Sequence, residues 1–233
     1  NHNNRRVIFT KTGAAAIVTL SVPTTLAYVV FQPASGSTTL QLSGASALTI
    51  SAPNAGNAIT FNSAADIFDL NTRALTIGTT GVANTITGGG TFRGSTTASL
   101  TLLGTGSIGT LSFGTGFQNL GTFTVNRTTG AIACFMGSPL AVVSAMNLTA
   151  GIIDLDAQTF TLNAAATITG ASSSNYFIAD NAFGGTLRKV YTTTGSFTFP
   201  IGDKTGTMEY SPATVNFTAG TFTGAFLGMS VND

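Results

Sequence analysis

The chain has 233 residues, of which only 7% are charged and 43% are hydrophobic, and this length allows a sizeable core. Its formal net charge of +1 comes from nine basic and eight acidic residues scattered thinly, which excludes an electrostatic footprint for nucleic acid or for an anionic membrane surface. The single cysteine excludes an intrachain disulfide, and with one histidine the chain has too few ligands for a Cys/His zinc site.

The residue types predict an all-β protein with almost no helix. Thr, Val, Ile and Phe recur in alternating patterns, Gly separates the runs, and the helix formers Glu, Lys and Gln are scarce. The longest apolar candidate for a membrane span, Ala14–Phe31, is interrupted by Thr, Ser and Pro residues. We therefore expect strands there and no membrane insertion.

Residues 1–35 begin with a polar tail that contains His2 and continue with three apolar runs that predict strands. Two interpretations fit this apolar terminus. It covers an otherwise open edge of the fold, or it is an arm exchanged with a neighbouring subunit, as in β-augmentation. The candidate assembly residues are Ile17, Val18, Leu20, Val22, Val29 and Phe31.

Residues 36–170 contain many short runs with an apolar–polar–apolar centre, such as Leu75-Thr76-Ile77 and Phe123-Thr124-Val125. Strand alternation places the two apolar side chains on one face and the polar one on the other. Each run is too short to bury a core alone, so we predict a β-solenoid, similar to a parallel β-helix, whose turns stack on one another. The clearest unit is Asn147–Gly170.

Residues 171–233 have longer runs and more turns bounded by proline, and they predict a β-sandwich-like region. Because the chain stops directly after an apolar run, we expect this region to continue beyond Asp233.

Few residues suggest chemistry. Asp154 and Asp156 lie at i and i+2, which predicts one strand face for both, and they are weak candidates for Ca²⁺ binding or acid/base work. No basic or aromatic residue accompanies them in sequence, which favours a solvated outer face. Cys134 is expected in the core, and the basic pair Arg188-Lys189 in solvent. We expect no catalytic residues, since the chain lacks Trp and has only four Tyr as sugar platforms. We also expect no cofactor and no metal.

Three segments resemble one family. They are TAGIIDLDAQTFTLNAAATITG, FIADNAFGGTLRKVYTTTGSFTFPIGD and YSPATVNFTAG. This combination is similar to the large repetitive surface proteins of Bacteroidota, which the type IX secretion system exports and which are similar in fold to β-helical adhesins and stalk modules. The resemblance implies an extracellular location at the cell surface and a role in adhesion or scaffolding, and it brings no catalytic residues.

We therefore expect a structural, non-catalytic surface protein, either a self-assembling filament subunit or an adhesin stalk module. Its expected partners are identical subunits and, beyond those, surface glycans or other cells. A polysaccharide-acting or polysaccharide-binding β-helix protein is the alternative. A minor alternative is an ice-binding solenoid, because outward Thr residues on stacked turns would form ladders, although their spacing in the sequence is irregular.

Overall fold

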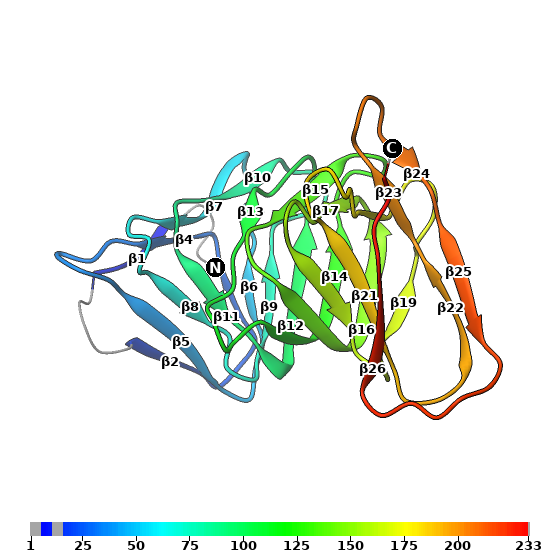
Figure 1. The fold of residues 1–233 in the computed structure, drawn as a ribbon. Helices are drawn as coiled ribbons and strands as arrows, with labels where there is room; N and C mark the ends of the chain where they lie inside the picture. The colour runs from blue at the N-terminus through cyan, green and yellow to red at the C-terminus, as the bar shows by residue number, and fades with distance from the viewer. Residues whose placement is uncertain (1–5, 11–15, 233) are drawn as a thin grey trace.

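The computed structural model describes residues 6–10 and 16–232, and these contain strands but no helix. The chain forms a β-solenoid of about eight turns, which confirms the predicted all-β class and the stacked repeats. In Figure 1 the colours follow one another along a single axis, so that consecutive turns lie side by side. The described part of the chain has no helix that is long and apolar enough to span a bilayer. His2 and Asp233 lie outside the described residues.

Two parallel sheets form two faces of the N-terminal half. Sheet A contains, in spatial order, β1 (Arg6–Phe9), β4 (Tyr28–Phe31), β7 (Gly56–Phe61) and β10 (Asn84–Thr87). Sheet B contains β11 (Thr91–Arg93), β8 (Ile67–Asp69), β5 (Thr39–Gly44) and β2 (Ala16–Leu20). Each turn of this half therefore contributes one strand to each face, and the third strand of the turn joins sheet C.

Sheet C is the longest and runs along most of the molecule (Figure 1). Its strands, in spatial order, are β3 (Thr24–Leu26), β6 (Leu48–Ile50), β9 (Ala74–Ile77), β12 (Ser95–Leu103), β14 (Asn119–Asn126), β16 (Leu140–Ala150), β18 (Thr159–Leu162), β21 (Thr186–Tyr191) and β26 (Ala225–Met229). A further strand, β19 (Thr167–Thr169), pairs with the second half of β16.

The remaining strands form sheet D and one ribbon. Sheet D contains β13 (Thr110–Leu111), β15 (Ile132–Met136), β17 (Ile152–Asp154), β20 (Phe177–Ile178), β23 (Ile201–Asp203) and β24 (Glu209–Tyr210). It follows sheet A along the axis, because a parallel bridge joins Ala83 to Thr105. The ribbon is the antiparallel pair of β22 (Gly195–Phe199) and β25 (Ala213–Phe217).

The alternation predicted from the sequence is present in the sheets. In sheet C, Leu48, Leu75, Leu100 and Phe123 are successive partners across four strands, and all four are buried. Their polar neighbours point to the outer face. Burying a large apolar side chain contributes roughly 1.5–3 kcal/mol, so a column of this kind is a principal source of stability.

Phenylalanines form a second column between sheets A and B. Ring centroids lie 4.7 Å apart between Phe31 and Phe61, 5.8 Å between Phe61 and Phe92, and 5.9 Å between Phe92 and Phe113. Phe68 of sheet B stacks on Phe92 at 5.9 Å. These separations fall in the range of favourable aromatic pairs, so the ladder holds the two sheets together.

The corners between strands impose their own requirement on the sequence. Gly88 follows β10 with φ of 91°, and a Cβ built there would lie 1.8 Å from the carbonyl oxygen of Phe61 in the turn below. Stacking of turns therefore requires glycine at this corner, both for the left-handed backbone and for the close approach.

Parallel pairing continues beyond residue 170, because β20, β21 and β23 extend sheets D and C. The β-sandwich expected for residues 171–233 is not confirmed. Instead, the C-terminal segment changes direction: β26 pairs antiparallel with β21, and β24 pairs antiparallel with β23.

At the N-terminal end of the solenoid, β1, β2 and β3 pair with strands of their own chain, namely β4, β5 and β6.

Replacement of Phe92 by alanine tests the aromatic ladder. Phe92 is 1% exposed and contacts rings above and below it, so Phe92→Ala should lower the free energy of unfolding by about 3–5 kcal/mol. Phe117 is 42% exposed, and its ring lies beneath the guanidinium of Arg93. Phe117→Ala should therefore lower the free energy of unfolding by less than about 1 kcal/mol. Urea denaturation followed by circular dichroism measures both, and equal losses would contradict this account of the core.

Candidate functional site

The two aspartates singled out in the sequence lie at a corner of sheet D. Asp154 ends β17 and is fully buried, whereas Asp156 follows it with φ of 46° and a side chain that is 44% exposed. The Nζ atom of Lys204 lies 2.7 Å from Oδ2 of Asp154 and 2.9 Å from Oδ1 of Asp156. The expected solvated face is thus wrong for Asp154, because the turn after β23 brings in a cation that lies 50 residues later in the sequence.

The corner acts as a carboxylate clamp on this lysine. Burial by itself lowers the pKa of Lys204, but hydrogen bonds and charges from the two aspartates outweigh burial and raise it. The backbone N–H of Asp156 also donates to Oδ1 of Asp154 at 3.0 Å, which uses a further lone pair. Among the described residues, no group of three or more His, Cys, Asp or Glu side chains is arranged to hold a metal ion.

Buried aspartates at other corners bind backbone N–H groups. Asp180 accepts hydrogen bonds from the N–H groups of Ala182 and Lys204 and from the hydroxyl of Thr205. Burial opposes ionisation of Asp180, yet these hydrogen bonds prevail and lower its pKa. Asp66 likewise accepts from the N–H groups of Thr38 and Ser63, each at 2.8 Å. These carboxylates close turns of the solenoid.

Arg127 is a buried cation whose hydrogen bonds reach backbone and amide oxygens. Its guanidinium donates to the carbonyl oxygens of Leu103, Thr105 and Gly106 one turn below. It also donates to the carbonyl and side-chain oxygens of Asn84, two turns below. Burial lowers the pKa of Arg127, but a guanidinium keeps its charge in proteins. One side chain therefore joins three turns of the corner.

The solvated basic pair predicted at Arg188-Lys189 is wrong for Lys189, which is only 7% exposed. Its Nζ donates to the carbonyl oxygens of Asn163, Ala164 and Ala166 at 2.7, 2.9 and 3.0 Å. Burial lowers the pKa of Lys189. The corner after β18 exposes carbonyl groups toward the interior, and the lysine satisfies them.

Cys134 lies in the core, as expected, with none of its surface exposed. Burial raises the pKa of its thiol to about 12, so the thiol stays protonated at neutral pH. A protonated, inaccessible thiol is a poor nucleophile.

The candidate assembly residues divide into two groups. Three of them are buried in the core of their own chain, namely Leu20, Val29 and Phe31. The others are Ile17 (63% exposed), Val18 (half-buried against the core) and Val22 (62% exposed).

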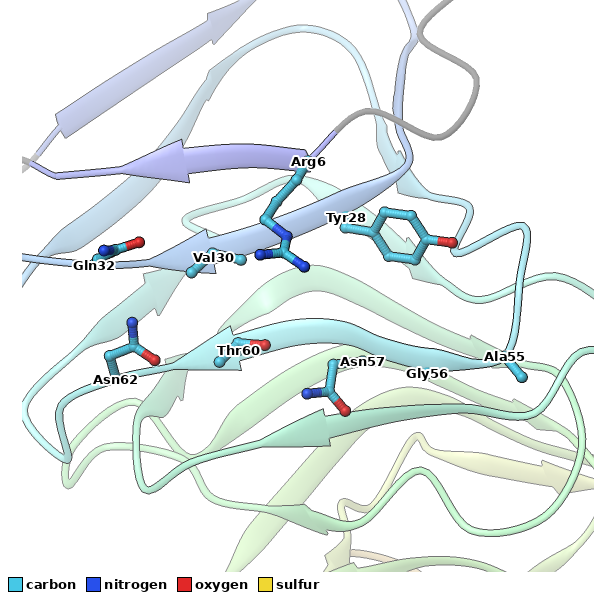
Figure 2. Close-up of a pocket in the computed structure, with 9 residues that line it drawn as sticks. All are labelled: Arg6, Tyr28, Val30, Gln32, Ala55, Gly56, Asn57, Thr60 and Asn62. Atoms are coloured by element: carbon cyan, nitrogen blue, oxygen red, sulfur yellow. The ribbon is translucent and has the colours of Figure 1, made fainter.

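A polar groove lies on the outer face of sheet A (Figure 2). Its volume is about 590 Å³, and strands β1, β4 and β7 and the residues that flank them supply its lining. Its side chains combine one guanidinium, three carboxamides, a phenol, a hydroxyl and small apolar groups, and no carboxylate. The lining residues are Arg6, Tyr28, Val30, Gln32, Ala55, Gly56, Asn57, Thr60 and Asn62.

A column of outward polar residues, the threonine column, runs along sheet C. Cross-strand register aligns one residue of each turn with the next, and none of the side chains is charged. The members of the column are Thr25, Thr49, Thr76, Thr101, Thr124, Asn147 and Thr169. Asn147 exchanges hydrogen bonds with the hydroxyls of its two threonine neighbours, at 3.1 and 2.9 Å.

The sequence predicts outward threonine ladders but not which residues align in them, and the groove does not stand out as a motif in the sequence. Alternation alone places Tyr28, Val30 and Gln32 on one face of a strand. Their alignment with Asn57 and Asn62 depends on the register between β4 and β7, where Val30 pairs with Thr60.

Comparisons with protein-family models, with curated proteins and with solved structures find no match to this chain.

The clamp on Lys204 predicts a specific dependence of stability on pH. A raised pKa in the folded state means that the stabilisation is complete below the ordinary lysine pKa of 10.5 and disappears as pH rises through the raised value. The double variant Asp154→Asn with Asp156→Asn should therefore be less stable than wild type by roughly 1–3 kcal/mol at neutral pH. This difference should shrink as pH rises above 10.5 and through the raised pKa, because Lys204 then loses its proton in both proteins.

Urea denaturation over a series of pH values measures this difference. Glu209→Gln is the control, because it removes an exposed carboxylate from β24 and should leave the profile unchanged. A stability difference that stays constant through the alkaline range would show that the charge of Lys204 is not its source.

Proposed function

We propose that this protein is a rigid, non-catalytic stalk segment of an extracellular surface protein. The observation that carries the proposal is the main hydrophobic core, which continues through the stacked turns from Leu20 in β2 to Ile201 in β23. A solenoid of this kind holds its two ends at a fixed separation, because each turn is hydrogen-bonded to the next. The described residues that suggest chemistry, Asp154, Asp156 and Cys134, have structural partners or are buried.

The C-terminal end favours a stalk over a self-assembling filament. A filament made by stacking solenoids requires that the first turn of one subunit continues the parallel sheets of the last turn of another. Here β26 covers the edge of β21 in antiparallel orientation, and β24 does the same for β23. Antiparallel edge strands interrupt the parallel pattern and so oppose further parallel stacking.

The proposed location at the cell surface has two supports. The sequence segments that resemble the repetitive surface proteins of Bacteroidota include strands β17 to β21 and β23, which belong to the last turns of the solenoid. The chain also has a low content of charged residues and one cysteine, so its stability relies on stacked side chains and not on disulfides.

The threonine column favours ice binding as a second candidate function. Strands in a sheet lie about 4.8 Å apart, so the column repeats its methyl and hydroxyl groups at that interval. The hydroxyls of Thr49, Thr76 and Thr101 have no hydrogen-bond partner among the residues that the structure describes, and small residues such as Ala74 and Ser99 flank them. A regular, uncharged array of this kind orders water at fixed intervals, as the surface of ice does.

The stalk proposal predicts isolated particles of uniform length in negative-stain electron microscopy and a monomer by light scattering. Removal of residues 221–233 takes away β26 and exposes the edge of β21, so the truncated chain should associate in a concentration-dependent manner. Phe226→Ser is the control, because it removes an exposed side chain but keeps the strand, and it should stay monomeric. Regular fibres of the intact chain would overturn the stalk in favour of a filament.

The ice-binding candidate predicts that the protein inhibits recrystallisation in frozen solution. Thr76→Tyr with Thr101→Tyr should abolish this inhibition without changing the unfolding midpoint, since both side chains lie on the outer face. Thr129→Tyr is the matched control, because Thr129 is exposed at a corner away from the column. If the wild-type protein leaves the recrystallisation of ice unchanged, the ice-binding function is excluded.

A further inference from the structure

We propose that the polar groove of sheet A binds an acidic polysaccharide, a chain that contains uronic acid units. The guanidinium of Arg6 would bind a sugar carboxylate, and the carboxamides of Gln32, Asn57 and Asn62 would bind sugar hydroxyls. This inference concerns a ligand of the surface and does not depend on the stalk proposal.

The groove offers hydrogen-bonding groups of both kinds. A carboxamide supplies two N–H donors and a carbonyl acceptor, which matches a hydroxyl that both donates and accepts. The side chains of Arg6, Gln32 and Asn62 have no hydrogen-bond or ion-pair partner among the residues that the structure describes. Their capacity is therefore available to a ligand that displaces water.

The position of Arg6 indicates that the ligand carries a negative charge. Figure 2 shows its side chain extending from β1 across β4, so that the guanidinium lies above the groove beside Val30 and Tyr28. No Asp or Glu is among the lining residues. A guanidinium binds a carboxylate through two parallel hydrogen bonds, a geometry that a neutral sugar does not offer.

Two of the lining residues are held in place by neighbours. Oδ1 of Asn57 accepts a hydrogen bond of 2.9 Å from the hydroxyl of Thr85 on β10, which leaves the amino group of the amide for a ligand. The hydroxyl of Tyr28 accepts a hydrogen bond of 3.3 Å from the N–H of Asn54, which fixes the ring beside the corner at Ala55. Groups fixed on strands lose little entropy on binding.

The shape of the groove fits a polymer better than a single sugar. From Tyr28 to Gln32 the strand advances four residues, which corresponds to about 13 Å. Polar groups lie at both ends of this path, whereas Val30 and Thr60 form its middle. One cation in a chain of net charge +1 is too little for nucleic acid, whose binding requires several phosphate contacts.

Isothermal titration with a tetrasaccharide of galacturonic acid tests the proposal on the full chain. We expect saturable binding that weakens as salt is added, since the interaction with Arg6 is exposed and therefore screened. The tetrasaccharide with its carboxylates reduced to alcohols should bind at least about tenfold more weakly, which corresponds to about 1.4 kcal/mol.

Substitutions of the lining residues test whether the tetrasaccharide binds in the groove. Arg6→Ala should weaken binding of the acidic tetrasaccharide about tenfold and leave the reduced one unchanged. Asn57→Ala with Asn62→Ala should weaken both. Arg93→Ala is the matched control, because it removes one positive charge from β11 of sheet B, outside the groove, and should leave binding unchanged.

Three results would overturn the proposal. They are an absence of saturable binding by the wild-type protein, equal affinity for the acidic and the reduced tetrasaccharide, and undiminished binding by the variants of Arg6, Asn57 and Asn62. Circular dichroism of each variant verifies that it is folded, so that a loss of binding reports on the groove. None of these outcomes changes the length or the oligomeric state on which the stalk proposal is judged.

Discussion

The hydrogen bonds between successive turns are the constraint on which the rest of this structure depends. They fix the register of parallel strands, so each side chain lies directly above a partner in the neighbouring turn. Inward columns must then be apolar at every level, since one polar side chain would be buried against apolar ones above and below it. The column Leu48–Leu75–Leu100–Phe123 and the register pairs Phe31–Phe61 and Phe92–Phe113 meet this requirement with ordinary core residues. Stability is therefore distributed along the axis, with each turn stabilised mainly by its two neighbours.

The corners have the opposite problem, because the chain turns away from its neighbours and leaves backbone groups without sheet partners. Buried charged side chains satisfy these groups. Carboxylates such as Asp66 and Asp180 accept from N–H groups, whereas Arg127 and Lys189 donate to carbonyl oxygens. A charged partner makes a stronger hydrogen bond than a neutral one, and an unsatisfied buried group would cost about 1–3 kcal/mol. Charged residues are few in this chain, and several of them are used at the corners.

Local patterns in the sequence predicted the strands but not their alignment. The triplet Leu75-Thr76-Ile77 identifies two inward and one outward side chain wherever its strand pairs. The register between strands does not follow from these local patterns, because aligned partners are 22 residues apart at Asn147 and Thr169 but 28 apart at Gln41 and Asp69. With no constant period, the sequence predicted outward threonine ladders but not which residues align in the column, and the groove was not visible. The clamp on Lys204 was missed for the same reason, and the antiparallel end at β26 depends on a reversal of the chain that alternation does not encode.

The separation of inward from outward positions explains how one core supports three different faces. Sheet A presents a guanidinium and carboxamides, sheet B pairs Gln41 with Asp69, and sheet C presents the threonine column. Substitutions on an outer face usually change stability by less than about 0.5 kcal/mol, so these faces can change without loss of the stacked core. A binding surface on such a scaffold therefore needs only a few residues brought into register from adjacent turns. In this molecule the inner face specifies the fold, and any ligand must be recognised by the outer faces or the corners.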